Sequence, residues 1–128
     1  MQPFPTLRTI TVDPLDDVLV VRILRAQMLD DRIDELRREC TAVVDAYKPR
    51  WVVFDLSQVW TISSTGVTVV INLLKRARAH GGDLVLCGLS PLVEQVFRLC
   101  QLVSDDPAET ALQVFREADQ AVAARKAA

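Results

Sequence analysis

The sequence contains a single histidine and few of the residue patterns on which catalysis usually depends. A hydrolase needs a nucleophile activated by a neighbouring base, but His80 directly precedes Gly81 and Gly82. That position is typical of a helix end, where the helix dipole suits an imidazole. A glycine-rich phosphate loop, an H-E-x-x-H motif and an EF-hand loop are also lacking. We therefore expect that the protein is not an enzyme and carries no cofactor or metal of its own.

Cysteine is scarce as well. Cys40, Cys87 and Cys100 are odd in number, widely spaced and set in apolar patterns, and no C-x-x-C pair occurs. Such cysteines are typical of reduced, small core residues rather than of metal ligands or disulfides. We predict that all three remain free thiols within the core.

Long apolar runs are absent, and no segment approaches the ~18 residues of a membrane-spanning helix. The first residues lack the pattern of a signal peptide. Excess positive charge is lacking too, since 15 Lys and Arg residues stand against 17 Asp and Glu residues, for a net charge of −2. That balance gives no basic footprint for nucleic acid. We expect a cytoplasmic protein that does not bind nucleic acid and does not insert directly into a membrane.

Apolar side chains, by contrast, are abundant: 50% of the 128 residues are hydrophobic and 25% are charged. This composition is typical of a globular protein, and the length is sufficient for one hydrophobic core. We predict one domain over residues 1–128, with frayed ends at 1–7 and 124–128. The basic residues within 75–78 are most simply interpreted as the solvated face of a helix.

The clearest pattern lies between residues 51 and 90. Residues 51–56 and 83–88 are apolar runs typical of buried strands. The segment between them opens with serines placed as N-caps, keeps apolar residues at helical spacing, and stops at Gly81-Gly82. Its β-branched residues favour a strand locally, but it is too long for one strand. We predict a β-α-β unit whose two strands lie parallel.

Further elements flank this unit. Residues 7–12 and 18–24 are β-rich and predict a hairpin around a turn at 13–17. Apolar residues at helical spacing then predict a helix between Asp31 and Pro49.

Beyond the unit, Ser90-Pro91 is typical of the start of a short helix. The expected core face of that helix consists of Leu92, Val93, Val96, Phe97 and Cys100. Residues 101–105 are a candidate edge strand. A last helix is predicted from Asp106, with a packed face of Leu112, Phe115, Ala118 and Val122.

The order of several short motifs resembles a STAS domain, the domain of bacterial anti-sigma-factor antagonists. The motifs are Asp55-Leu56-Ser57, then Ile62-Ser63-Ser64-Thr65-Gly66, and then the second strand with its continuation to Pro91. The similarity covers roughly residues 8 to 120. It implies an α/β fold with a mixed four- to five-stranded sheet and about four helices packed largely on one face.

The resemblance also implies a site of phosphorylation. In the family the loop reads Asp-Ser-Ser-Gly or near it, and its second residue is the serine that a partner kinase phosphorylates. Ser64 stands at that position here, while Ser63 replaces the acidic residue and becomes a rival acceptor. An acidic residue after the second strand lies near this site in the family, and Asp30 or Asp31 matches it. The residues alone favour a simpler role for one of these hydroxyls, as a helix cap.

The implied function is antagonism of an anti-sigma factor. Unphosphorylated, the protein would bind an anti-sigma factor that is a serine protein kinase; phosphorylation would release it, and a phosphatase would reset the switch. The alternatives are a constitutive interaction module, in a stress-signalling assembly or beside a transporter, and small-ligand binding beside the loop. Besides Ser64, the expected loop and partner-binding residues are Asp30, Asp31, Asp55, Ser57, Trp60, Ile62, Ser63, Thr65 and Gly66.

Three apolar residues, Trp60, Ile62 and Val67, border the loop. Any of them that stays exposed would form the surface on which a partner lands. Burial in the core is the competing interpretation, above all for Val67.

Overall fold

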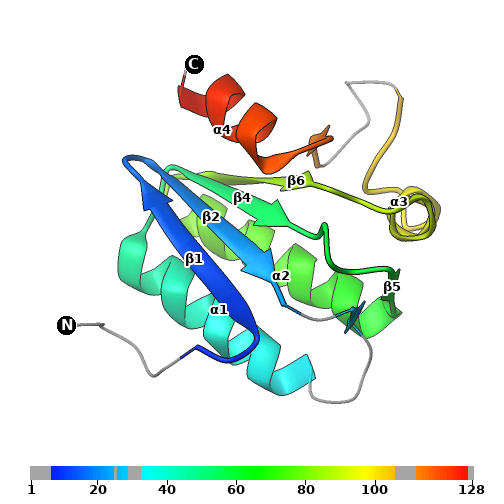
Figure 1. Cartoon of the computed structure of the whole chain (residues 1–128). Helices are drawn as coiled ribbons and strands as arrows, with labels where there is room; N and C mark the ends of the chain where they lie inside the picture. The colour runs from blue at the N-terminus through cyan, green and yellow to red at the C-terminus, as the bar shows by residue number, and fades with distance from the viewer. Residues whose placement is uncertain (1–6, 25, 29–32, 106–111, 127–128) are drawn as a thin grey trace.

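A five-stranded sheet with the order β1-β2-β4-β6-β7 forms the centre of the computed structural model (Figure 1). The structure describes residues 7–24, 26–28, 33–105 and 112–126. The strands of this sheet are β1 (Ile10–Leu15), β2 (Val18–Ile23), β4 (Trp51–Asp55), β6 (Asp83–Cys87) and β7 (Val114–Phe115). β1 is antiparallel to β2, and the remaining pairs are parallel. The predicted α/β fold with a mixed sheet is therefore confirmed.

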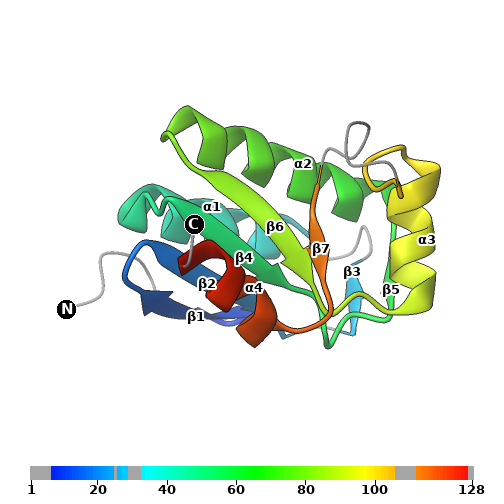
Figure 2. The ribbon, with the colours of Figure 1, turned by 90° about the horizontal axis from the view of Figure 1, so that it is seen from above.

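Four helices surround the sheet. They are α1 (Ile33–Tyr47), α2 (Ser64–Ala79), α3 (Pro91–Leu99) and α4 (Ala118–Lys126). α1 and α2 cover one face, and α4 lies on the opposite face (Figures 1 and 2). A small second sheet pairs β3 (Gln27–Met28) with β5 (Thr61–Ile62) in parallel. None of the described helices is both long and apolar enough to cross a membrane.

The predicted β-α-β unit is present as β4, α2 and β6. β4 and β6 pair in parallel, with Trp51 opposite Asp83 and Asp55 opposite Cys87. α2 keeps its helical form despite its β-branched residues because Val67, Val69 and Val70 are buried against the core. Tertiary packing thus outweighs the local preference for a strand.

The two faces of the sheet pack against apolar clusters of very different size. On the α1–α2 side, Val52 and Phe54 of β4 belong to a large apolar cluster. On the other side Val53 joins a small cluster that α4 covers through Ala121. The guanidinium carbon of Arg125 in α4 lies 4.4 Å from the ring centre of Trp51, so a cation–π contact helps to hold this helix in place.

The first hairpin has a tighter turn than the sequence predicts. β1 continues to Leu15, and Pro14 pairs with Leu19, so that only Asp16 and Asp17 form the turn. Pro14 is tolerated because β1 is an edge strand, where a missing N–H interrupts no further pairing. Asp16 takes a positive φ of 58°, a conformation that aspartate tolerates better than most residues.

The predicted course of the C-terminal region is wrong in two respects. Residues 101–105 form no strand; instead Val114–Phe115 pairs with the end of β6. The last helix begins at Ala118, so Leu112 and Phe115 precede it. The edge of β6 offers backbone groups that a neighbouring strand satisfies better than solvent does. The predicted start at Asp106 lies outside the described residues.

Two predicted core residues of α3 are exposed. Val93 and Phe97 are buried and Val96 is partly buried, but Leu92 is 47% exposed and Cys100 faces solvent. α3 has only nine residues and touches the domain along a narrow stripe. The prediction for the other two cysteines is confirmed: Cys40 and Cys87 are buried free thiols. Burial raises the pKa of Cys87 to about 12, which keeps it protonated.

The end of α2 depends on two glycines with different tasks, and we predict that replacing them has unequal costs. A Cβ at Gly82 would stand 2.7 Å from the carbonyl oxygen of Arg50, against backbone that cannot yield. Gly82→Ala should lower the free energy of unfolding by about 3 kcal/mol. Gly81 has φ +85° with open space around it, so Gly81→Ala should cost only about 1 kcal/mol. Urea unfolding of both variants provides the comparison, and equal losses would contradict the packing argument.

Candidate functional site

The loop between β4 and α2 lies at the carboxyl ends of the parallel strands (Figure 1). Its path is fixed by backbone hydrogen bonds. Leu56 N–H donates to the Cys87 carbonyl at 3.0 Å, and Trp60 N–H donates to the Ala26 carbonyl at 2.8 Å. The β3–β5 pair anchors its far end. The start of α2 is therefore held rigidly at this end of the sheet.

Asp55, at the end of β4, is buried, and its carboxylate holds the first part of the loop. One carboxylate oxygen accepts a hydrogen bond from Arg22 Nε at 2.8 Å, and the other accepts from the Ser57 N–H at 2.9 Å. Only 3% of Asp55 is exposed. The sequence interpretation grouped Asp55 with the partner-binding residues, and its contacts give it a supporting position, whereas Ser57 is exposed.

The protonation of Asp55 reflects two opposing effects. Burial raises the pKa of the carboxyl group, while the hydrogen bonds from Arg22 and Ser57 lower it. The hydrogen bonds prevail, and the pKa of Asp55 lies below its ordinary value. The carboxylate therefore stays ionised at neutral pH and keeps both contacts.

The three hydroxyl residues at the start of α2 have distinct positions. Ser63 is the N-cap: its Oγ accepts a hydrogen bond from the Gly66 N–H at 3.2 Å. Ser64 is the first residue of the helix, and both Ser64 and Thr65 are exposed. The capping role predicted for one hydroxyl is thus taken by Ser63, and Ser64 lies in the solvent-facing first turn.

The surroundings of Ser64 suit a negatively charged group. The first turn of α2 contains no acidic residue. The amides and the dipole of a helix N-terminus favour anions. A phosphate on Ser64 is therefore compatible with the folded chain. Asp30 and Asp31, the acidic residues expected nearby, lie outside the described residues.

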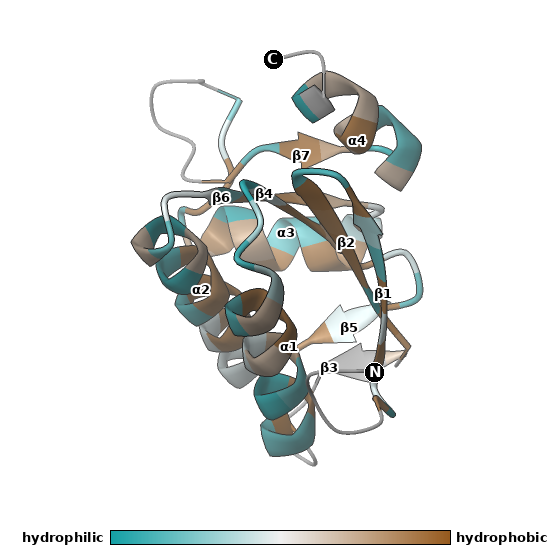
Figure 3. Ribbon diagram, turned by 90° about the vertical axis from the view of Figure 1, so that its left-hand side faces the viewer, coloured by the Kyte–Doolittle hydropathy of each residue, from teal (hydrophilic) through white to brown (hydrophobic). Residues whose placement is uncertain are grey.

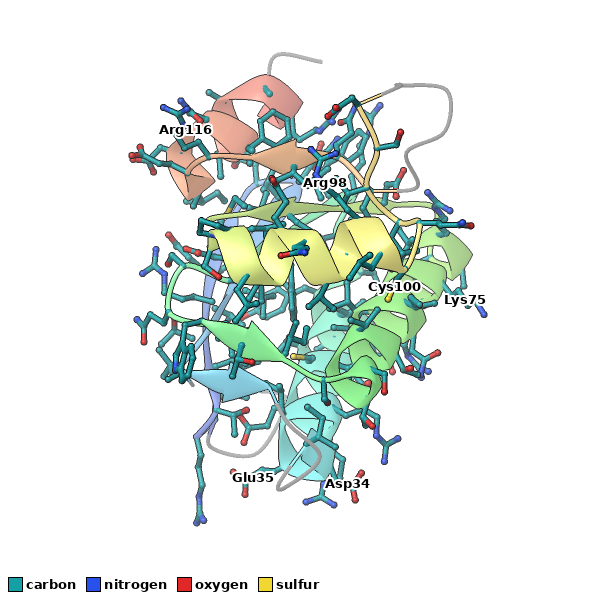
Figure 4. The ribbon with its side chains drawn as sticks, turned by 90° about the vertical axis from the view of Figure 1, so that its right-hand side faces the viewer. Asp34, Glu35, Lys75, Arg98, Cys100 and Arg116 are labelled. Carbon is teal, nitrogen blue, oxygen red and sulfur yellow. The ribbon has the colours of Figure 1, made fainter. Side chains whose placement is uncertain are left out.

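The apolar residues around the loop divide into buried and exposed ones. Ile62 and Val67 are buried, with 6% and 3% of their surfaces exposed, and they belong to the core. Trp60 is 55% exposed. Figure 4 looks onto this end of the molecule, where α3 and α2 both contact β5. Trp60 is thus the member of the predicted group that remains for a partner.

Leu92 adds a second exposed apolar side chain at the start of α3. The sequence interpretation assigned Leu92 to the core face of this helix. The spacing of four between Val93 and Phe97 was the signal that only one narrow stripe of α3 is buried. We call Trp60, Ser64, Thr65 and Leu92 the loop surface.

Asp55 and Ser57 also line a small hollow of about 230 Å³. The side chains around this hollow carry charges of both signs. The lining residues are Arg22, Asp55, Ser57, Gly88, Arg116, Glu117, Ala118 and Asp119. Gly88 has φ +71°, and a Cβ there would stand 2.8 Å from that of Ser57. Within the described part of the chain, no group of three or more His, Cys, Asp or Glu residues could hold a metal ion.

Comparisons with known proteins agree with this architecture. A family model described as STAS domain matches residues 9–121. BtrV of Bordetella bronchiseptica, named as a candidate anti-sigma factor antagonist, is 36% identical in an alignment of 113 residues that covers 85% of this chain and 96% of BtrV.

Solved structures share the fold at lower identity. An anti-sigma factor antagonist from Mycobacterium paratuberculosis superposes with a TM-score of 0.75 at 21% identity, covering 92% of this chain and 93% of that one. Unphosphorylated SpoIIAA superposes with a TM-score of 0.73 at 13% identity, covering 93% of this chain and 97% of that one. The phosphorylated form of the Bacillus protein has a TM-score of 0.65 at 14% identity, covering 91% and 98%.

We predict that Asp55→Asn destabilises the fold in a pH-dependent way. The variant loses the charge that Arg22 pairs with, and at pH 7 the free energy of unfolding should fall by about 1–3 kcal/mol. Because the folded pKa of Asp55 is lowered, its stabilising effect is present above the unfolded pKa of about 3.9 and is lost as pH falls through the folded value. The difference between wild type and variant should therefore shrink below about pH 4.

Urea unfolding between neutral and acidic pH measures this difference. Asp34→Asn is the matched control, because Asp34 pairs with Arg37 at an exposed position. It should change stability by less than about 0.5 kcal/mol. A gap between wild type and Asp55→Asn that stays constant at low pH would refute the assignment.

Proposed function

This chain belongs to the STAS domain family of anti-sigma-factor antagonists, and from that premise we propose that the loop surface binds an anti-sigma factor which is itself a serine kinase. Phosphorylation of Ser64 by that partner would end the interaction. The observation that carries the proposal is the position of Ser64: an exposed hydroxyl on the first residue of α2, on a rigidly held loop.

The capping role of Ser63 favours Ser64 as the acceptor. A kinase needs a hydroxyl that can enter its active site, and the Oγ of Ser63 is engaged with the Gly66 N–H. Modifying Ser63 would remove a cap that contributes ~1 kcal/mol to the helix. Modifying Ser64 leaves that cap in place.

Phosphorylation would act on the interface rather than on the fold. The phosphate adds about −1.5 to −2 charges at neutral pH, and the helix N-terminus accommodates them. Inside a closed interface, however, the same group must lose water or face a partner's acidic residues. A penalty of ~4 kcal/mol would weaken binding about a thousandfold, which is enough to switch an interaction.

Trp60 and Leu92 would supply the apolar part of the same interface. Both are large side chains that the fold leaves exposed, at 55% and 47%. Binding energy in protein interfaces is concentrated in a few such residues, among which tryptophan is frequent. Trp60 and Ser64 flank β5 at its two ends, so an apolar anchor and a modifiable hydroxyl would contribute affinity and control to one interface.

The decisive experiment is phosphorylation of the purified chain by its cognate kinase-type anti-sigma factor and ATP. We expect one phosphate, on Ser64, and a phosphorylated protein that no longer binds the kinase. Ser63→Ala should still be phosphorylated, and Ser64→Ala should bind without being modified. Ser64→Asp should weaken binding by about a hundredfold or more. Absence of phosphate from Ser63, Ser64 and Thr65 would remove the switch and leave a constitutive interaction module, for which equal binding by all variants would be the sign.

A second prediction concerns the anchor. Trp60→Ala should weaken binding of the anti-sigma factor by about thirtyfold or more, while the free energy of unfolding changes by less than about 1 kcal/mol because the side chain is exposed. Leu99→Ala is the control, since Leu99 is 75% exposed at the far end of α3. Isothermal titration calorimetry measures both affinities. Equal effects of the two substitutions would place the interface elsewhere.

A further inference from the structure

A groove of about 540 Å³ runs between the outer sides of α1 and α2. Figure 3 shows the two helices side by side with hydrophilic residues along these sides. The residues that line the groove are Arg37, Thr41, Asn72, Lys75, Arg76, Ala79 and His80. From Ser64 to Asn72 the helix rises about 12 Å, so the groove is separate from the loop surface.

The lining of this groove has an unusual charge pattern for a chain with a net charge of −2. Among the described residues that line it, the ionisable ones are all basic: Arg37, Lys75, Arg76 and His80. Thr41 and Asn72 add neutral groups that can donate hydrogen bonds. Basic side chains and hydrogen-bond donors are therefore gathered in one concave place on an acidic protein.

The carboxylate of Asp45, at the margin of the groove, fixes part of this arrangement. Both oxygens of Asp45 accept from Arg76, at 2.7 and 2.8 Å, and His80 Nε2 lies 3.0 Å from the same group. The hydrogen bonds from Arg76 and His80 lower the pKa of Asp45 to about 2, so this carboxylate stays charged. Arg76 and His80 are consequently held in place along one end of the groove.

The other two basic residues keep more capacity for a ligand. Arg37 reaches Asp34 at 3.3 Å, but both side chains are more than half exposed, so the pair is weak. Among the side chains that the structure describes, no carboxylate pairs with Lys75. Lys75 points away from the sheet into solvent (Figure 4). Lys75 thus has a charge that no described carboxylate pairs with, and Arg37 shares its charge only with the exposed Asp34.

We propose that this groove binds a short acidic segment of a partner protein, with carboxylates of the segment at Arg37 and Lys75. From Asn72 to His80 the groove spans about 12 Å, which an extended peptide covers with about four residues. Among the described residues, the lining includes no phenylalanine, tyrosine, tryptophan or large aliphatic side chain, and the one ring it has, that of His80, is held by Asp45. A nucleotide base would therefore find no apolar platform on which to stack. Charge complementarity therefore favours a carboxylate-rich peptide over a nucleotide.

The test uses the full chain and a fluorescein-labelled peptide of about eight alternating Glu and Asp residues, long enough to overrun the groove. Its counterpart has Gln and Asn at the same positions. Fluorescence anisotropy should detect binding of the acidic peptide alone, and the affinity should fall as salt rises from about 50 to about 300 mM. The double variant Arg37→Glu with Lys75→Glu should weaken binding by about tenfold or more.

The matched control is Arg50→Glu with Arg116→Glu, two exposed basic residues outside the groove. It changes the net charge by the same amount and should alter affinity by no more than about twofold, since distant surface charges are screened. Lys75→Ala, which introduces no repulsion, should weaken binding as well. Circular dichroism confirms that each variant is folded, and nuclear magnetic resonance shift changes should fall on residues 37, 41, 72, 75 and 79.

Three results would overturn the proposal. Equal weakening by the two double variants would reduce it to a general charge effect. Shift changes confined to other surfaces would place the peptide elsewhere. Tighter binding of a single-stranded DNA oligonucleotide that displaces the peptide would assign the groove to nucleic acid. Ser64→Ala should leave peptide binding unchanged, so the outcome is independent of the phosphorylation proposed above.

Discussion

The position of β4 between β2 and β6, with both of its faces buried, is the constraint on which the structure depends. Its inward residues pack against α1 and α2 on one side and against the small cluster under α4 on the other. β4 ends at Asp55, at the edge of the sheet where the parallel strands have their carboxyl ends. There the side chain of Asp55 is held by Arg22. The loop surface is positioned by that fixed end, since the loop begins at the next residue and is hydrogen-bonded to Cys87 and Ala26.

The site also shows how adjacent residues of one type acquire different tasks. Ser63 and Ser64 are chemically alike, but one closes the helix and the other projects from its first turn. The difference arises from backbone geometry alone, because the N-cap has extended dihedrals that turn its Oγ back toward the helix amides. A serine in place of the family's acidic residue is therefore consistent with a stable helix start, since aspartate and serine cap helices almost equally well.

Much of this arrangement could be predicted from the sequence, and each prediction that failed did so for a physical reason. The β-α-β unit and the start of α3 at Ser90-Pro91 were predictable because strands, caps and glycine stops act locally. The pairing of Val114–Phe115 with β6 was not, since a two-residue strand leaves no periodicity and depends on an open sheet edge. The burial of Asp55 escaped prediction for a different reason. Its partner Arg22 is 33 residues away, and only the parallel register of β2 and β4 brings them together.

The different surroundings of the two tryptophans have a practical consequence. The chain has two tryptophans, and they lie in unrelated surroundings: Trp51 beneath Arg125 of α4, and Trp60 exposed on the loop surface. Their emission should therefore report separate events, the seating of the C-terminal helix in one case and occupancy of the loop surface in the other. Replacing either tryptophan by phenylalanine would leave a single intrinsic fluorophore, whose emission reports one of these two events.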